Sequence, residues 1–298
     1  MQLKRVLGAD REAPLDRLVD GLIVGLLERL EPDHLNDPRF ALAMLRDAFR
    51  PYRKRVRGIV DRGDPSGPTD ARRRFERLLA TIETSLPPLP AAVALSLVRE
   101  ADRFLGCAVE LPESDLDVAS HFRMSSSFGR KARLLWAIVR SLHPLCCLEA
   151  GTAYGMGSLV ILSALESQGP EGMLSTVEAQ PAIAALAFES LRARFGGRVR
   201  GWLGLSEKLL PEMAAELGGV DFFFHDACHS GEAYVGDFAA VADWLSPGAA
   251  VLFDDIRWSG AGSATASRCE AGWKEVASHP RVRLAAEIGS NLGLLLVD

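Results

Sequence analysis

Two short apolar runs in the second half of the chain are each followed by side chains that can bind metals or move protons. Asp226 and His229 follow the first run. Asp254 and Asp255 follow the second. If the two runs are parallel strands of one sheet, their carboxyl ends border the same crevice. The sequence therefore predicts that these four side chains meet.

Three carboxylates at one point repel each other unless a cation neutralises them, and oxygen ligands suit a hard ion such as Mg²⁺. We therefore expect Asp226, Asp254 and Asp255 to bind a divalent cation. Such a cation lowers the pKa of a bound hydroxyl, and His229 can accept the proton at neutral pH. Asp226 and His229 are the predicted catalytic pair. A turn former or cofactor contact at Asp226, and a loop cap at Asp255, remain alternatives.

Residues 145–150 form another apolar run, and a glycine turn follows it. The turn contains Gly151 and Gly155 and precedes a helical pattern. A strand, a glycine turn and a helix together bring backbone N–H groups to a small ligand. The glycine spacing is neither that of dinucleotide binders nor that of phosphate loops, and no Lys-Ser/Thr pair follows. The sequence therefore predicts a different nucleoside-bearing cofactor.

Short apolar runs alternate with helical patterns after about residue 110, which predicts a parallel sheet with helices on both faces. The chain ends in two apolar runs around Gly289, which predict an antiparallel hairpin. The predicted strands are 145–150, 173–177, 199–203, 220–225 and 249–253, followed by the hairpin strands 282–288 and 292–297. The predicted helices are 157–167, 182–194, 206–217 and 234–245.

The first third of the chain has apolar residues at helical spacing from residue 15 to about 105. We expect a helical N-terminal region over 1–115 and a second domain over 116–298. The basic clusters 50–57 and 72–77 are expected on solvated helix faces. The helical region is expected to be a lid, a substrate-selecting element or a dimer interface.

Composition excludes several classes of partner. The net charge of −5 gives no electrostatic reason for nucleic acid binding. No apolar stretch reaches the roughly 20 residues that a membrane helix needs, and the start lacks the apolar segment of a secretory signal. The five cysteines are odd in number and lack metal-binding spacing. These features predict a reduced cytoplasmic protein that binds neither nucleic acid nor membrane.

The order of these motifs resembles class I S-adenosylmethionine-dependent methyltransferases over about residues 121–297. The resemblance implies a doubly wound, mostly parallel seven-stranded sheet with an antiparallel last strand, and S-adenosyl-L-methionine as cofactor. Residues 149–155 resemble the first motif E-x-G-x-x-x-G, Glu178 matches the acid that binds ribose, and Ser206 belongs to the segment bordering adenine. The implied cofactor contacts are Glu149, Gly151, Thr152, Gly155, Ser158, Glu178, Ser206, Asp226 and, in the loop before the first strand, Ser127.

The acidic residues and the histidine resemble those of metal-dependent O-methyltransferases. In the catechol-type pattern, an acid and a lysine base follow the fourth strand and an acid-amide pair follows the fifth. Here the matching residues are Asp226 with His229, and Asp254 with Asp255, so histidine replaces lysine and aspartate replaces asparagine. These departures favour the relatives that act on sugars of natural products. The resemblance implies O-methylation of a hydroxyl on a small molecule or natural product.

Other functions remain open beside this one. A metal-independent N- or carboxyl-O-methyltransferase would use the same cofactor turn, and a non-catalytic cofactor-binding scaffold would recruit a partner through the helical region. A nicotinamide dehydrogenase is disfavoured by the missing glycine motif and by the terminal hairpin. Cys228 beside His229 suggests a thiol hydrolase, but neighbours in sequence do not generally form a nucleophile–base pair.

Overall fold

The structure is a computed structural model that describes residues 14–62, 70–107, 111, 117–126, 128–258, 263–289 and 291–298. The chain divides into two compact units. Residues 1–52 and 87–133 form the helical unit, and residues 53–86 and 134–298 form the sheet unit. The expected single boundary near residue 115 differs from this division, because residues 53–86 pack with the sheet.

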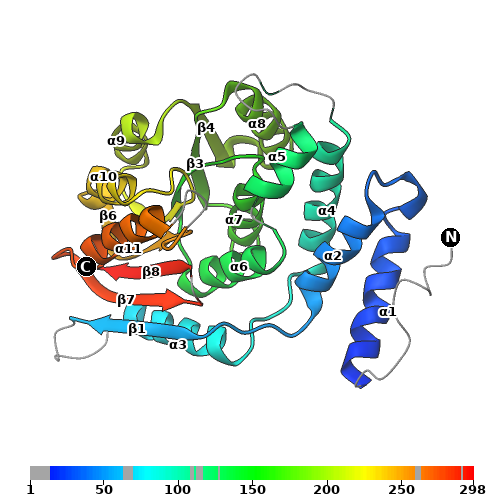
Figure 1. The fold of residues 1–298 in the computed structure, drawn as a ribbon, viewed down its shortest axis with the longest axis horizontal. Coiled ribbons are helices and arrows are strands. Elements are labelled where there is room, and N and C mark those ends of the chain that lie inside the picture. The colour runs from blue at the N-terminus through cyan, green and yellow to red at the C-terminus, as the bar shows by residue number, and fades with distance from the viewer. Residues whose placement is uncertain are drawn as a thin grey trace. The chain divides into compact units, whose positions relative to one another are not determined.

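The sheet unit is built on one mixed sheet of eight strands (Figure 1). The strand order is β1-β7-β8-β6-β5-β2-β3-β4. The five strands from β6 to β4 are parallel, whereas β8 runs antiparallel to both β6 and β7. The strands are β1 (Val56–Asp61), β2 (Cys146–Ala150), β3 (Met173–Glu178), β4 (Val199–Leu203), β5 (Val220–His225), β6 (Leu245–Phe253), β7 (Val282–Ile288) and β8 (Leu292–Val297).

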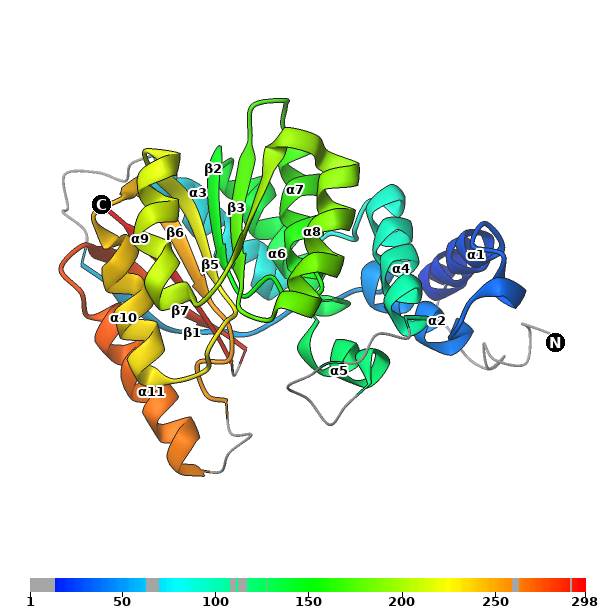
Figure 2. The ribbon, with the colours of Figure 1, turned by 90° about the horizontal axis from the view of Figure 1, so that it is seen from above.

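Helices cover both faces of this sheet (Figure 2), as the alternating pattern predicted. One face is covered by α7 and α8, and the other by α9, α10 and α11. Coverage on both faces explains why the central strands are buried at almost every position. The helices of this unit are α3 (Asp70–Thr84), α7 (Met156–Glu166), α8 (Pro181–Phe195), η3 (Gly196–Arg198), α9 (Ser206–Leu217), α10 (Gly231–Ala242) and α11 (Ser263–Ala277), and α6 (Arg130–Leu142) begins in the helical unit.

The parallel central strands, the helices on both faces and the antiparallel terminal hairpin confirm the predicted fold class, with one strand more than the seven expected. The extra strand, β1, pairs antiparallel with β7 and lies inside the region predicted to be helical. Five of its six residues are exposed, so it lacks the apolar alternation that marks a half-buried strand. The prediction that the basic cluster 50–57 lies on a helix face is therefore wrong beyond residue 50, where α2 has ended.

The helical unit has its own aromatic core. Phe104 stacks on Phe122 with ring centroids 5.5 Å apart, and Phe40 meets Phe122 edge-on at 6.2 Å. Asp37 accepts a hydrogen bond from the backbone N–H of Phe40 and so caps α2. The elements are α1 (Pro14–Glu28), η2 (Pro32–His34), α2 (Pro38–Phe49), α4 (Ala91–Leu105) and α5 (Val118–Ser125). In the described part of the chain, no helix has the length and hydropathy needed to cross a bilayer.

Candidate active site

The glycine turn follows β2 and leads directly into α7. Gly151, Ala153 and Gly155 have positive φ angles of 90°, 44° and 77°. The backbone N–H groups of Gly151 and Thr152 both donate to the carbonyl oxygen of Val177, at 3.0 Å. The turn is therefore bound to the end of β3 through its own backbone, and α7 starts at its last glycine.

A buried hydrogen-bond network supports this turn from the interior. The Glu149 carboxylate accepts hydrogen bonds from the hydroxyls of Ser158 and Thr176, the latter at 2.6 Å. The Thr152 and Thr176 hydroxyls are also 2.6 Å apart. Glu149, Thr152 and Ser158 are at most 3% exposed. The structure thus places three predicted cofactor contacts in the interior, where they fix the turn rather than face solvent.

Glu178 ends β3 and reaches the same turn from the next strand. One carboxylate oxygen accepts the N–H of Ala153 and the other accepts that of Gln180, both at 2.8 Å. The side chain is half-buried. Each carboxylate oxygen has a further lone pair, so Glu178 can also accept hydrogen bonds from the hydroxyls of a ribose. The turn and this acid therefore fit a nucleoside-bearing cofactor.

Ser206 begins α9 and belongs to a buried polar chain that the sequence did not reveal. Its hydroxyl donates to Asp237 at 3.0 Å, and the same Asp237 oxygen lies 2.9 Å from Nε2 of His225. The His225 ring stacks on Phe253 with centroids 5.2 Å apart. His225 is therefore part of a buried polar chain, in which Asp237 joins α10 to the start of α9.

The predicted catalytic residues lie at the carboxyl ends of β5 and β6. Asp226 follows β5, and its N–H donates to the carbonyl oxygen of Ala150 at 2.8 Å. Nε2 of His229 lies 3.5 Å from Oδ2 of Asp255, with both side chains about a quarter exposed. The ring of Trp258 lies 5.7 Å from the His229 ring. The structure thus brings together His229 and Asp255 from the two loops, as predicted.

The loop after β6, residues 254–258 and here called the β6 loop, is held by its neighbours. Tyr234 donates from its hydroxyl to the carbonyl oxygens of Asp254 and Asp255, at 3.1 and 2.9 Å. Burial raises the pKa of Tyr234, which keeps this hydroxyl a donor. Asp254 is 3% exposed, and Asp255 has a positive φ of 55°. The two adjacent acids therefore have different environments, one buried and one partly open.

Asn291, in the turn between β7 and β8, contacts three successive residues of the β6 loop. Its amide nitrogen donates to the Asp255 carboxylate. Its side-chain oxygen accepts the N–H of Arg257 at 3.1 Å, and its carbonyl oxygen accepts that of Ile256 at 2.9 Å. Sequence reasoning missed Asn291 because the only signal was one asparagine in a hairpin turn. The hairpin therefore orients the carboxylate that faces His229.

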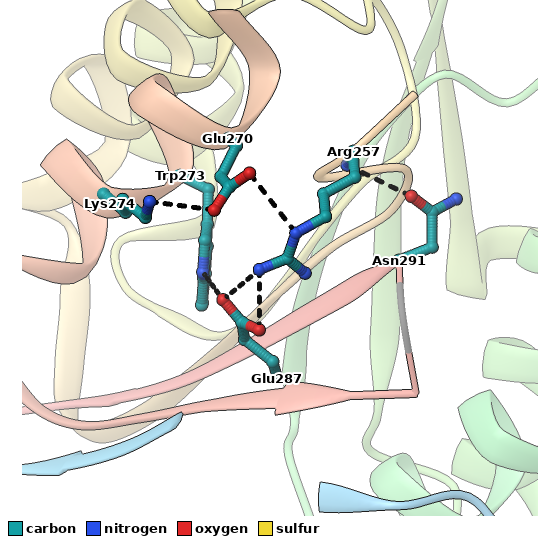
Figure 3. Close-up of polar contacts among 6 residues, drawn as sticks. All are labelled: Arg257, Glu270, Trp273, Lys274, Glu287 and Asn291. Atoms are coloured by element: carbon teal, nitrogen blue, oxygen red, sulfur yellow. Dashed lines mark hydrogen bonds and ion pairs between the residues drawn. The ribbon is translucent and has the colours of Figure 1, made fainter. Parts of the chain in front are cut away.

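Arg257 anchors the same loop to the sheet from the other side (Figure 3). Its guanidinium nitrogen lies 2.8 Å from both carboxylate oxygens of Glu287, on β7. Trp273 of α11 donates its indole N–H to Glu287 at 3.1 Å. Glu270 lies 3.5 Å from Arg257 and 2.8 Å from Lys274, and the hydrogen bond from Lys274 lowers the pKa of Glu270.

The predicted metal site is not assembled among the described side chains. They contain no group of three or more His, Cys, Asp or Glu residues arranged to hold an ion. The carboxylate of Asp255 contacts Asn291 and His229, and Asp254 is buried. Ser127, predicted to contact the cofactor, lies outside the described residues.

Solved structures establish the fold, and a family model identifies the domain. A methyltransferase from Podospora anserina, solved with S-adenosylhomocysteine, has a TM-score of 0.56 at 18% identity and covers 79% of this chain and 100% of that one. Another solved structure is an O-methyltransferase from Streptomyces achromogenes that is involved in tomaymycin synthesis and was solved with S-adenosylmethionine. It has a TM-score of 0.51 at 22% identity and covers 60% of this chain and 86% of that one. A model described as a methyltransferase domain matches residues 148–256. The chain therefore has the fold of these methyltransferases, and residues 148–256 match the methyltransferase domain.

Curated O-methyltransferases are similar to part of this chain. A probable O-methyltransferase from Mycobacterium tuberculosis is 35% identical over 141 residues, which are 44% of this chain and 58% of that protein. A transmembrane O-methyltransferase from Homo sapiens is 34% identical over 137 residues, which are 44% of this chain and 45% of that protein. The chain thus spans about half the length of the curated relatives it matches. The residues that match the family model, 148–256, include the glycine turn.

Proposed function

We propose that this class I methyltransferase transfers a methyl group from S-adenosylmethionine to a hydroxyl of a small molecule or natural product. The observation that supports it most directly is the pairing of His229 with Asp255 at the carboxyl ends of β5 and β6. The glycine turn of the cofactor motif follows β2, which is paired with β5. A proton acceptor and a cofactor turn on neighbouring strands are what O-methylation requires.

The cofactor side of the proposal rests on the glycine turn and Glu178. The backbone of residues 151–155 would border the cofactor, and Glu178 would accept hydrogen bonds from its ribose hydroxyls. Ser206, at the start of α9, would border the adenine, although its hydroxyl is bonded to Asp237. When bound, S-adenosylmethionine supplies the methyl group as an electrophilic carbon attached to a cationic sulfur.

The catalytic side rests on His229. In our mechanism Nε2 of His229 takes the proton of the acceptor hydroxyl, the acceptor oxygen forms a bond to the methyl carbon, and the carbon–sulfur bond breaks. Asp255 is 3.5 Å from Nε2, a distance longer than a hydrogen bond, so its effect is electrostatic. The carboxylate stabilises the imidazolium that forms. Trp258, 5.7 Å from the histidine ring, provides an aromatic wall for the acceptor.

Divalent-metal assistance is a separate proposal, suggested by the three carboxylates Asp226, Asp254 and Asp255. The arrangement of the described side chains does not fit an assembled metal site, so the mechanism above includes no metal step. Turnover measured with EDTA, and again after adding Mg²⁺, tests this proposal. A loss with EDTA that Mg²⁺ restores would support metal assistance, and unchanged turnover would reject it.

The main experiment measures release of S-adenosylhomocysteine with a panel of phenols, catechols and hydroxylated sugars. We expect turnover of at least one acceptor, and a fall in kcat of about 10²–10⁴-fold in His229→Gln. His34→Gln is the matched control, because His34 is exposed on η2 in the helical unit. S-adenosylmethionine affinity, measured by calorimetry, should weaken in Glu178→Gln and stay unchanged in His229→Gln.

Two outcomes would overturn the proposal in different ways. Tight cofactor binding without turnover of any acceptor would favour a non-catalytic cofactor-binding scaffold. Full activity of His229→Gln, especially towards amines or carboxylic acids, would favour a metal-independent N- or carboxyl-O-methyltransferase.

A further inference from the structure

The helical unit contains a basic cavity that the proposed methyl transfer does not use. Its volume is about 390 Å³, and it lies between α2, the segment that follows α2 and the start of α6. Four arginines, one acid and one aromatic ring are among its lining residues: Arg39, Arg46, Arg50, Arg130, Asp47 and Tyr52. All of them belong to the helical unit.

The charge of this lining is unusual for the chain. Four arginines against one aspartate give the cavity a formal charge of +3, whereas the whole chain has a net charge of −5. Asp47 lies 3.3 Å from Arg130, and Arg50 lies 3.4 Å from Asp20. Because like charges at close range repel, an excess of cations around one cavity favours an anion inside it.

Arg46 gives a second, independent indication of a ligand. Its Nε atom is buried, and no hydrogen-bond acceptor within the described residues contacts it. A buried guanidinium donor without an acceptor is unfavourable, and most such donors are satisfied in folded proteins. A rotation of the guanidinium would bring this donor to an oxyanion in the cavity that Arg46 lines.

The wall opposite α2 is fixed by an aromatic ring and a buried arginine. The guanidinium carbon of Arg130 lies 5.1 Å from the centroid of the Tyr52 ring. Arg133 is 1% exposed, lies 5.9 Å from the same ring and donates to the carbonyl oxygens of Arg50 and Pro87. These contacts hold residues 50–52 in place, so the basic lining does not depend on exposed side chains alone.

We propose that this cavity binds a small molecule with two or more negative charges on phosphate or carboxylate groups. Guanidinium groups match the oxygens of both with paired hydrogen bonds, and the cavity has the size of a small-molecule site. The site is separate from the proposed methyl transfer and does not rest on it. The anion would be an effector or the charged part of a larger ligand.

Calorimetric titration of the full chain at low ionic strength tests this site, with inorganic pyrophosphate and citrate as separate probes. We expect saturable binding of at least one probe, and the stronger probe indicates whether phosphate or carboxylate is preferred. Arg46→Gln and Arg39→Gln should each weaken that binding by roughly tenfold. Arg99→Gln, which removes an exposed arginine of α4 outside the cavity, should not. S-adenosylmethionine affinity and thermal unfolding check that each variant is folded.

Three results would overturn the proposal. The first is that neither probe binds the wild-type chain. The second is that Arg99→Gln weakens binding as much as Arg46→Gln does, because that would indicate only diffuse electrostatic attraction. The third is unchanged affinity in both Arg39→Gln and Arg46→Gln. Arg39 is exposed on α2, so its substitution should leave the fold intact and keep the test decisive if Arg46→Gln does not fold.

Discussion

A Cβ atom on Gly151 would lie 2.2 Å from the carbonyl oxygen of Asp226 and 2.6 Å from its carbonyl carbon. Both atoms are backbone, so no side-chain rotation can relieve the contact. The N–H of Asp226 also donates to Ala150, one residue before the glycine. The glycine turn and the loop after β5 are therefore held against each other, and the glycine is needed for this packing as well as for its φ of 90°.

Gly151→Ala should consequently destabilise the sheet unit. Positive φ strain alone costs about 1–3 kcal/mol, and the contact with Asp226 adds to it. Gly236→Ala is the matched control, because Gly236 lies inside α10, where an added Cβ would meet no other part of the described chain within 4 Å. Helix propensity predicts a gain of up to about 1 kcal/mol there. Urea unfolding measures both, and an equal effect at the two glycines would contradict the argument.

Asn291→Ala should reduce kcat while lowering the free energy of unfolding only modestly. The substitution removes the side-chain bonds to Asp255 and to the N–H of Arg257 but keeps the backbone bond to Ile256. Each lost hydrogen bond costs about 1 kcal/mol of unfolding free energy, whereas the orientation of Asp255 towards His229 is lost. We expect kcat to fall with little change in S-adenosylmethionine affinity. Unchanged kcat would show that the hairpin does not position Asp255.

Arg257 and Glu287 should be energetically coupled. Their contact at 2.8 Å joins the β6 loop to β7, and both side chains are mostly buried. Removing one partner leaves the other charge poorly compensated. Each single substitution should therefore destabilise the protein more than expected from the effect of the double substitution. A double-mutant cycle with Arg257→Met and Glu287→Met should give a coupling energy of about 1–3 kcal/mol. A value near zero would mean that the β6 loop is held without this ion pair.

The stability of the protein should fall in alkaline solution through Cys147 of β2. Burial raises the pKa of this thiol in the folded state. In the unfolded state the thiol has a pKa of about 8.5. Above that pH the unfolded thiol ionises while the folded one stays protonated. The unfolded state then binds fewer protons, and the free energy of unfolding decreases as pH rises above about 8.5. Urea unfolding between neutral and alkaline pH should show that the free energy of unfolding decreases less steeply with pH in Cys147→Ala than in the wild type. Parallel slopes in the two proteins would reject this prediction.

Much of the sheet was predictable because its strands are buried. Strands β4, β5, β7 and β8 begin and end at the predicted residues. Most residues of β5, β7 and β8 are buried, and turn residues flank these strands. β1 was not predictable, because it is exposed and lies among arginines, so nothing in its pattern distinguishes it from a loop or a polar helix. Its pairing with β7 is decided by tertiary structure.

The site was predictable where a single strand end determines the position of a side chain. His229 and Asp255 meet because parallel strands end at the same edge. Glu149 shows the limit of that reasoning, because a strand-end carboxylate can face inward and bind hydroxyls such as that of Ser158. Asp237 and Asn291 were missed because their partners come from other elements, and no spacing in the sequence records such contacts.

The pairing of β1 with β7 also determines when the sheet can be completed during synthesis. Val56 lies opposite Ile288, so more than 200 residues of chain are made between β1 and its partner strand. Domains generally fold as units from the N-terminus during synthesis, and contacts between distant residues form slowly. The edge of this sheet therefore closes only after β7 has been made, and until then β1 lacks its partner strand.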